Sequence, residues 1–553
     1  DNTVNTLDGD ITAADGATGV VVTGDDTRTT INGDIYASGG ATGLTVSGNA
    51  ASVTNQGSIT AVDSGSTGVA IDGNTASFTN TGTIDSSLNG TGVSITGNSA
   101  SVTLDGTVNV HAEKNADGVY QGATGVSVAG NNGTTDITGD VAISGSMDES
   151  DVVAPEGTLT GVEVSGTGNT VTLDGAVNMT LDSTHENDIN AFTATGIAVT
   201  GNENTINING GVNVSTSSID KKYDDARMGH NAYGVTVTGN NTVNVSGQST
   251  VDITGSVGAT TGLATLSDGG HLVLNSDSVL DINYHAASDW GYAEGAVMTA
   301  SGPGSSIDNR GVINATTGTT IARVSGGATI NNSGTVDMSP ALSNSSFSQA
   351  GAFEASGTGS SAINAQGGTI SITSDYTPYL DGGVAKTPVF WSQNTGYALL
   401  ATNYGSVEND AGATINLNGA GLYGVAAAKG TATNAGTINV DGFIPTLDED
   451  GNITAKSFYS TGYLPTMSAG VITGSTDTGY GNATGLNTGT INVNNEGFGM
   501  LALNGGTVTN QGTINLTADE GVTASADNQL IGMGVINGGS AINDESGVIN
   551  INA

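Results

Sequence analysis

The chain contains no cysteine, seven prolines and ten lysine or arginine residues among its 553 positions. The absence of cysteine excludes a disulfide framework and thiolate metal sites, and it is compatible with export. The scarcity of proline excludes both a collagen and a proline-rich linker, although the 87 glycines are about twice the usual share. No run of 18 apolar residues occurs, so the sequence predicts no transmembrane helix.

The few basic residues are outnumbered by 52 acidic ones, which gives a formal net charge of -42. A field of this sign repels nucleic acid and anionic membrane surfaces, and it favours cations and basic partners. We therefore expect no nucleic-acid partner. No secretion signal opens the chain, and Asp1 is interpreted as a processed or trimmed start.

One short phrase is repeated four times within the first hundred residues. It begins with Thr-Gly, carries two apolar residues separated by one other residue, and ends with Gly. It occupies Thr18–Gly24, Thr42–Gly48, Thr67–Gly73 and Thr91–Gly97. The first glycines of these phrases lie 24, 25 and 24 residues apart. A fixed period of this size is typical of a solenoid.

Within each repeat the apolar residues alternate with small polar ones, as in a strand with one buried face. The first strand of each coil is predicted to point two residues inward: Val20 and Val22, Leu44 and Val46, Val69 and Ile71, and Val93 and Ile95. Gly, Asn and Asp occupy the corners, where the chain turns with positive φ. Coils of three short strands must stack in parallel to bury their inner faces. The predicted fold is an all-β, single-stranded parallel β-helix with three strands per rung, continuous over residues 1–553.

The repeats become longer after residue 110, and all of the additional residues lie between the third strand of one coil and the first strand of the next. Four insertions occupy this place, at residues 110–123, 145–159, 180–194 and 215–232. Insertions at one register of consecutive coils leave the solenoid at the same corner, about 4.8 Å apart. We therefore expect residues 110–232 to form a wall or the lip of a groove.

These insertions differ chemically from the rest of the chain, because they combine carboxylates, basic residues and aromatic rings. Ammonium and guanidinium groups pair with sulfated or carboxylated glycans, and Tyr stacks on a sugar face. The predicted ligand-binding residues are Lys114, Asp117, Tyr120, Asp148, Asp151, Asp188, Lys221, Lys222, Tyr223 and Arg227. The alternative interpretation is a set of solvated loops whose lysines neutralise the neighbouring aspartates.

Two larger insertions, at residues 373–396 and 441–469, follow the same strand and are rich in aromatic residues. They are predicted to form a secondary contact region that includes Tyr376, Tyr379, Trp391, Phe458 and Tyr459. In the alternative interpretation, these rings pack the insertions down onto the coil beneath them.

No arrangement of residues predicts catalysis or a bound metal. Glycoside hydrolysis needs two carboxylates at a fixed separation, and the β-helix families that perform it add His and a basic residue on neighbouring coils. No such cluster is seen on the predicted strands, and the five histidines are scattered. Asp448–Asn452 resembles a fragment of a calcium loop but lacks the downstream bidentate Glu. The alternative there is a hairpin tip between residues 443–447 and 453–458. Neither a catalytic residue nor a metal or other cofactor is predicted.

Two repeated phrases, Asn434–Ile438 (Asn-Ala-Gly-Thr-Ile) and Thr91–Asn98 (Thr-Gly-Val-Ser-Ile-Thr-Gly-Asn), occur in a chain that is acidic and lacks cysteine. In these features the sequence resembles the AIDA-type autotransporter adhesin passengers of enterobacteria (UpaB-like and EhaB-like proteins). The resemblance covers nearly the whole chain, and it is one of repeat style. It implies a right-handed parallel β-helix on the bacterial surface, exported through the periplasm and outer membrane by a C-terminal β-barrel. The sequence contains neither the export signal nor that barrel, so it is interpreted as an excised passenger. The barrel would be its only expected link to a membrane.

The resemblance and the insertions together imply adhesion rather than catalysis. The expected role is to bind a host extracellular-matrix protein of the fibronectin type, or a glycosaminoglycan, through the insertion-lined face. Two alternatives remain open. One is self-association between cells, which promotes aggregation and biofilm, and the other is a polysaccharide-degrading β-helix enzyme.

Overall fold

The computed structural model describes residues 3–148, 150–151, 153–184, 191–218, 229–255, 261–286, 296–340, 349–374, 380–381, 384–385, 395–419, 421–442, 446–447, 453–454, 468–474, 482–519 and 530–552. The chain divides into two compact units. Unit 1 comprises Asp1–Leu280 and Ala286–Ser288, and unit 2 comprises Asp281–His285 and Asp289–Ala553. The described residues form strands joined by turns, and none of them forms a helix long and apolar enough to cross a membrane.

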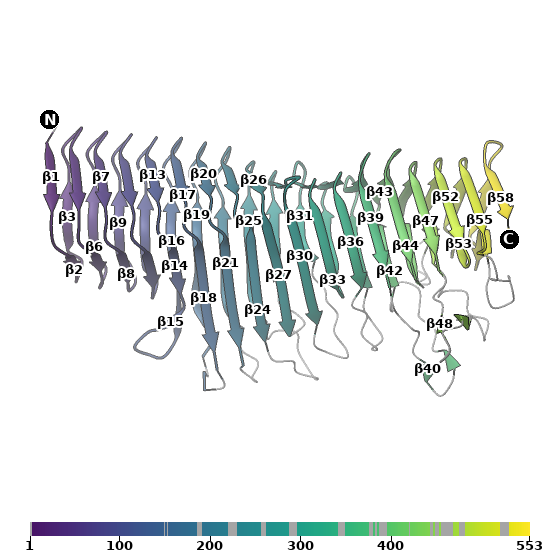
Figure 1. The fold of residues 1–553 in the computed structure, drawn as a ribbon, viewed down its shortest axis with the longest axis horizontal. Coiled ribbons are helices and arrows are strands. Elements are labelled where there is room, and N and C mark those ends of the chain that lie inside the picture. Colours follow the sequence, from purple (N-terminus) through teal and green to yellow (C-terminus); the bar gives the residue numbers. More distant parts are fainter. Residues whose placement is uncertain are drawn as a thin grey trace. The chain divides into compact units, whose positions relative to one another are not determined.

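Each unit is a right-handed parallel β-helix with three strands per rung, which confirms the predicted fold class (Figure 1). We name the three sheets A, B and C, and each coil passes through C, A and B in turn. The continuity of one β-helix over residues 1–553 stays a prediction.

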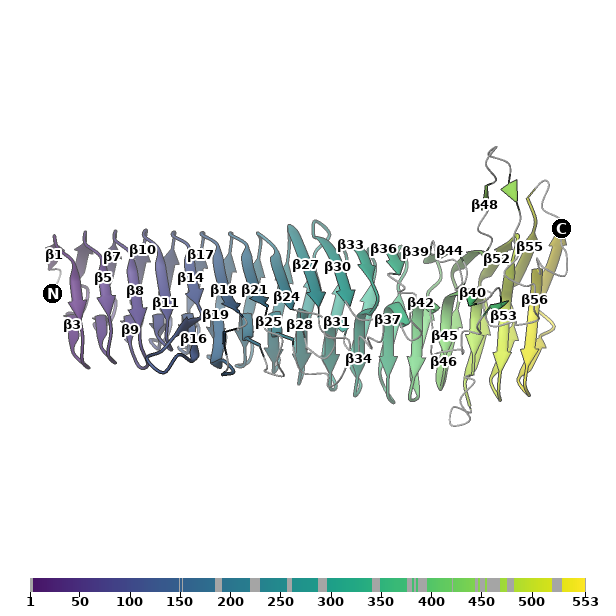
Figure 2. The same cartoon turned by 90° about the horizontal axis from the view of Figure 1, so that it is seen from below.

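Unit 1 contributes short strands to all three sheets, and Figure 2 shows neighbours such as β8, β11 and β14 lying side by side. Sheet A contains β1 (Val4–Leu7), β4 (Arg28–Ile31), β7 (Ser52–Asn55), β10 (Ser77–Asn80), β13 (Ser101–Leu104), β17 (Thr134–Ile137), β20 (Thr170–Leu173), β23 (Thr205–Ile208), β26 (Thr242–Val245) and β29 (His271–Leu274). Sheet B contains β2 (Ile11–Ala13), β5 (Ile35–Ala37), β8 (Ile59–Val62), β11 (Ile84–Ser87), β14 (Val108–His111), β18 (Val141–Met147), β21 (Val177–Ser183), β24 (Val212–Ser218) and β27 (Gln248–Gly255). Sheet C contains β3 (Thr18–Val22), β6 (Thr42–Val46), β9 (Thr67–Ile71), β12 (Thr91–Ile95), β15 (Glu113–Lys114), β16 (Tyr120–Val128), β19 (Glu156–Val164), β22 (Thr193–Val199), β25 (Asn231–Thr238) and β28 (Thr261–Ser267).

Unit 2 repeats the same arrangement. Its sheet A contains β32 (Ser306–Asn309), β35 (Thr329–Asn332), β38 (Ser361–Asn364), β43 (Gly405–Asn409), β46 (Gly430–Asn434), β51 (Thr484–Asn487), β54 (Thr507–Asn510) and β57 (Ser540–Asn543). Sheet B contains residues 281–285 of β30 (Val279–Ala286), together with β33 (Val312–Thr317), β36 (Thr335–Pro340), β39 (Thr369–Thr373), β44 (Thr414–Asn418), β47 (Thr437–Asp441), β52 (Thr490–Asn494), β55 (Thr513–Thr517) and β58 (Val548–Asn552). Sheet C contains β31 (Ala296–Ser301), β34 (Thr320–Ser325), β37 (Gln349–Ser356), β42 (Thr395–Thr402), β45 (Leu422–Ala427), β50 (Ala469–Thr473), β53 (Gly497–Leu503) and β56 (Leu530–Ile536).

The core of each unit consists of columns of apolar side chains that stack in register from coil to coil. Leu44 pairs with Val69 across β6 and β9, and Val69 pairs with Val93 across β9 and β12. All three side chains are fully buried. The inward direction predicted for the first strands is therefore confirmed, and Val20, in the first described coil, is the one predicted core residue that is partly exposed. Stacking supplies the burial that a single coil lacks.

A ladder of buried asparagines runs through unit 2 at the corner between sheets A and B. Its members are Asn309, Asn332, Asn364, Asn409, Asn434, Asn487 and Asn510, and it ends on Asn543. In every step the Nδ2 group of one residue donates to the Oδ1 atom of the next, at 2.7–2.8 Å. Five members of the ladder begin an Asn-x-Gly phrase: Asn309, Asn332, Asn434, Asn487 and Asn510. The ladder pairs these buried amides, and an unpaired one would cost about 1–3 kcal/mol.

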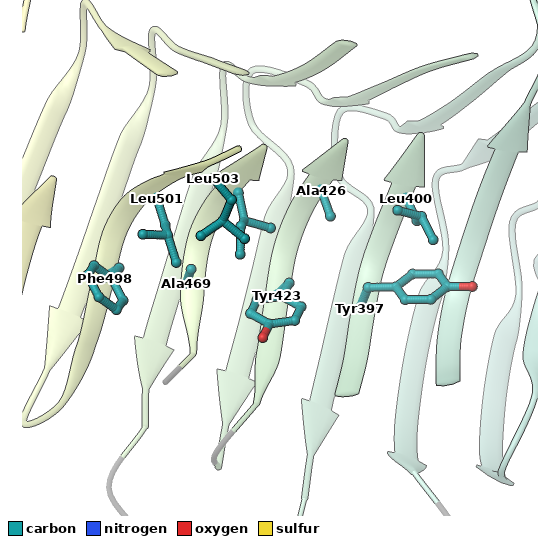
Figure 3. Close-up of a cluster of buried hydrophobic side chains, with 9 residues drawn as sticks. Tyr397, Leu400, Tyr423, Ala426, Ala469, Phe498, Leu501 and Leu503 are labelled. Carbon is teal, nitrogen blue, oxygen red and sulfur yellow. The ribbon is translucent and has the colours of Figure 1, made fainter. Parts of the chain in front are cut away.

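The outer face of sheet C changes character within unit 2. One outward column begins with Arg323 and Glu354 and continues, in register, as Leu400, Ala426, Ile472 and Leu501. The last four side chains are at most 3% exposed, so both faces of these strands are buried. Figure 3 shows this cluster, with the rings of Tyr397 and Tyr423 on neighbouring strands and Ala469 between Tyr423 and Phe498. The aromatic residues of unit 2 therefore include a packed outer layer that the sequence analysis did not predict.

Two small antiparallel hairpins also occur in unit 2. β40 (Leu380–Asp381) pairs with β41 (Val384–Ala385), and β48 (Thr446–Leu447) pairs with β49 (Ile453–Thr454). The predicted hairpin tip at residues 448–452 lies outside the described residues, between these two strands.

Candidate functional site

The insertions of unit 1 leave the β-helix at the corner between sheets B and C, and they begin and end as extensions of the strands. β11 and β12 have four and five residues, whereas β18, β21 and β24 each have seven and β16 and β19 each have nine (Figure 1). The pairing continues in register past the corner, from Gly145 through Leu181 to Thr216. The predicted loops are therefore partly strand, because the alternation of buried and exposed residues persists into them.

The first two insertions are joined by an ion pair. The Nζ atom of Lys114 lies 2.5 Å from Oδ1 of Asp151, whose side chain is only 5% exposed. The same Nζ atom lies 4.9 Å from the ring centroid of Tyr120. The hydrogen bond to Asp151 raises the pKa of Lys114, and burial raises the pKa of the Tyr120 hydroxyl. Lys114 thus stays charged, and Asp151 is its ion-pair partner within the protein.

The third and fourth insertions join this group through aromatic rings. The rings of Tyr120 and Phe192 meet edge to face, with their centroids 5.3 Å apart. On its other side, the ring of Phe192 stacks on that of His230 at 6.0 Å, with 6° between the planes. Phe192 is 2% exposed, and it packs over Gly145, where an added Cβ would lie 2.9 Å from the ring. We name Asp151, Lys114, Tyr120, Phe192 and His230 the insertion cluster.

The structure describes five of the ten predicted ligand-binding residues. Asp151, Lys114 and Tyr120 belong to the insertion cluster. Asp117 is exposed in a turn whose backbone is held by the Asn115 side chain, and Asp148 accepts hydrogen bonds from Ser150. Asp188, Lys221, Lys222, Tyr223 and Arg227, and all five residues of the secondary contact region (Tyr376, Tyr379, Trp391, Phe458 and Tyr459), lie outside the described residues.

Sequence reasoning missed two members of the insertion cluster as site residues. Phe192 and His230 lie just before the extended starts of β22 and β25, and both are buried. Their position in the sequence could have indicated burial. Each lies near the end of an insertion, where the chain returns to the alternation of apolar and polar residues found in sheet C.

The imidazole of His230 is 2% exposed and has a single hydrogen bond. Its Nε2 group donates to the carbonyl oxygen of Ser217 at 3.0 Å, and its buried Nδ1 atom has no partner. Burial lowers the pKa of this residue, against the opposing effects of the Ser217 carbonyl and the Asp182 carboxylate. His230 is therefore neutral, and protonating it would bury a charge with an unsatisfied second N–H group.

This burial predicts a loss of stability of unit 1 in acid. The unfolded chain binds a proton at His230 near its ordinary pKa, whereas the folded chain binds it only at lower pH, so the free energy of unfolding falls as pH drops below about 6.5. Denaturant unfolding at pH 7.5 and pH 5 is expected to show a smaller loss for His230→Phe than for the natural chain. His111→Gln, which removes a half-exposed histidine, is the matched control, and an equal pH response of both variants would contradict the assignment to His230.

Unit 2 contains a groove on the outer face of sheet B that the sequence analysis did not predict. It has a volume of about 510 Å³ and is lined by residues of β30, β33, β36 and β39. Its polar residues lie at outward positions of strands like those elsewhere in the chain, so no local sequence motif predicts the groove. Among the described residues, no group of three or more His, Cys, Asp or Glu residues gathers as a metal-ligand set.

Comparisons with known proteins place the chain within a family. The model of the BigA third pectate lyase-like domain matches residues 262–547, just over half of the 553 residues. The chain is 48% identical over 320 residues to BigA of Salmonella typhimurium, which is described as a surface-exposed virulence protein. That alignment covers 58% of this chain and 16% of BigA, so the chain spans only a small part of the length of this relative.

One solved structure, that of the PL6-family alginate lyase AlyGC, aligns over 99% of this chain and 97% of its own, with 11% identity and a TM-score of 0.15. A likeness of this size carries no weight for fold or activity. The sequence match supports a surface-exposed virulence family, which is broader than the AIDA-type adhesins that the repeats resemble. By the extent of its match, the chain belongs to the BigA third pectate lyase-like domain family.

Proposed function

We propose that this chain is part of a bacterial surface adhesin, displayed as an autotransporter-type passenger, and that it binds a host extracellular-matrix protein through the insertion-bearing side of unit 1. The relative described as surface-exposed supports the location. The observation that carries the proposed site is the insertion cluster, in which side chains from four separate insertions touch one another. Such packing orders the surface before a partner arrives, which reduces the entropy lost on binding.

The charges of this surface favour a basic protein over a glycosaminoglycan. Lys114 is already paired with Asp151, so a sulfate or carboxylate group would have to compete with that carboxylate for it. Asp117 is exposed on the same insertion, in a chain of net charge -42. Like charges repel at such a surface, whereas opposite charges raise the rate of encounter. A matrix protein that presents lysine and arginine side chains fits this surface better than a polyanion does.

Charge reversal on the surface tests this proposal. Asp117→Lys is expected to weaken the binding of immobilised fibronectin about threefold to tenfold, with most of the loss in the association rate at low salt. Asp136→Lys, at an exposed position of β17 in sheet A, is the matched control and is expected to have less effect. Surface plasmon resonance at 50 and 150 mM salt measures both. Equal losses in the two variants would show that only the bulk charge of the chain matters.

A further inference from the structure

The groove on the outer face of sheet B in unit 2 is formed by two rows of outward side chains. One row contains Asp281, Asn314, Asp337 and Ser371, in which Asn314 pairs with Asp337 and Asp337 with Ser371 across successive strands. The second row contains Asn283, Thr316, Ser339 and Thr373. None of the described lining residues is a lysine, arginine or histidine. The groove thus combines hydroxyl and amide groups with two carboxylates and no positive charge.

Beyond the groove, the first row continues as a regular hydrogen-bonded ladder. Asn439, Asn492, Asn515 and Asn550 each donate from Nδ2 to Oδ1 of the preceding asparagine, at 2.8 Å, and Asn416 donates to Ser371 at 3.2 Å. Every donation in this part runs toward the N-terminus. Each side chain in the row therefore finds its partner one coil away.

The ladder is interrupted at Asp337. The Nδ2 group of Asn314 donates to Oδ1 of Asp281, at 2.7 Å, and so points away from Asp337. On the other side, Ser371 receives its hydrogen bond from Asn416. Within the described part of the chain, the exposed carboxylate of Asp337 has no hydrogen-bond donor. The asparagines further along the row donate to their neighbours, but neither neighbour of Asp337 in the row donates a hydrogen bond to its carboxylate.

We propose that this groove binds a lysine or arginine side chain of a partner protein, with the Asp337 carboxylate as the principal acceptor. A carboxylate only accepts hydrogen bonds, whereas an ammonium group offers three donors and a guanidinium group five. The hydroxyl groups of Thr316 and Ser339 lie on the same face and accept the remaining donors. The two carboxylates repel uronic acids and sulfated sugars, and the net charge of -42 favours a cationic partner.

The expected contribution is modest because the groove is open to solvent. An exposed ion pair contributes at most about 1 kcal/mol, which corresponds to about a fivefold change in affinity. The site lies in unit 2 and does not depend on the proposed contact surface of unit 1.

The test compares two substitutions that remove the same charge from the full chain. A fluorescein-labelled peptide of alternating lysine and serine is the probe, and its dissociation constant is measured by fluorescence anisotropy at 150 mM salt. Asp337→Asn is expected to raise that constant about fivefold, and Asp337→Glu, which keeps a carboxylate, to change it less than twofold. Asp277→Asn, at an exposed turn of unit 1, is the matched control with an expected change below twofold.

Two results would overturn the proposal. If Asp337→Asn and Asp277→Asn weaken peptide binding equally, the peptide responds to bulk charge and not to the groove. If Asp337→Asn leaves peptide binding unchanged but abolishes the binding of labelled maltohexaose, the groove holds a neutral saccharide instead. Neither result bears on fibronectin binding by unit 1, which the Asp117 variants test separately.

Discussion

Phe192→Ala is expected to lower the free energy of unfolding of unit 1 by about 3–5 kcal/mol, the usual cost of deleting a buried aromatic ring. Phe192 is 2% exposed and contacts both Tyr120 and His230, so its removal separates the first insertion from the fourth. Because each coil of a solenoid contacts only its neighbours, the damage is expected to stay local. Hydrogen exchange should show lost protection in residues 113–128 and 229–238 before any other part of unit 1.

Phe353→Ala provides the matched control, since that ring is 1% exposed in β37 of unit 2. It is expected to cost similar stability while leaving fibronectin binding unchanged, whereas Phe192→Ala is expected to reduce both. Equal fibronectin binding by the two variants would show that the insertion cluster is not required for adhesion. Unchanged hydrogen exchange around Tyr120 would contradict the packing role assigned to Phe192.

Glu496→Gln is expected to stabilise unit 2 by about 3 kcal/mol at pH 8.5 and to have no such effect at pH 4.5. Glu496 is 4% exposed in the turn between β52 and β53, and burial raises the pKa of its carboxyl group to about 7. The unfolded chain ionises at the ordinary value of 4.5, so stability is lost as pH rises from 4.5 through about 7. Glutamine keeps the shape of the side chain without that ionisation, and each pKa unit corresponds to about 1.4 kcal/mol.

Urea unfolding followed by circular dichroism from pH 4.5 to 8.5 measures this difference, with Glu545→Gln as an exposed control in the same unit. A gain that is independent of pH would show that packing, and not ionisation, distinguishes the variant. The pH response of Glu496 is opposite in sign to that of His230, so the two units are expected to lose stability at opposite ends of the pH range.

The sequence predicts the fold well because the fold is local and repeated. The alternation around Val69 and Ile71, and the fixed distance to the next such pair, specify a strand and its stacking partner without knowledge of distant contacts. The position of the insertions follows from the same count, since growth in the spacing falls at one corner. Handedness does not follow from spacing, and it came from the family resemblance.

The candidate site is less predictable because it depends on how side chains from different coils meet. The sequence indicates that Lys114 and Asp151 lie in neighbouring insertions, but not that they pair with each other instead of a ligand. The groove at Asp337 depends on the direction in which Asn314 donates, which no spacing encodes. Likewise, the apolar outer column at Leu400 and Ile472 is visible in the sequence only once the register with Arg323 is known.

The buried asparagine ladder makes amide orientation a collective property of unit 2. In four members of the ladder, the Nδ2 group that donates to the next coil also lies near a carbonyl oxygen of its own turn. These are Asn332, Asn364, Asn434 and Asn487, at 3.3–3.4 Å. Rotating one amide by a half-turn would set oxygen against oxygen on one side and nitrogen against nitrogen on the other. The stack therefore has a polarity that its members share, much as aligned dipoles do in a polar crystal. A coil joining the stack inherits that orientation from the one already in place.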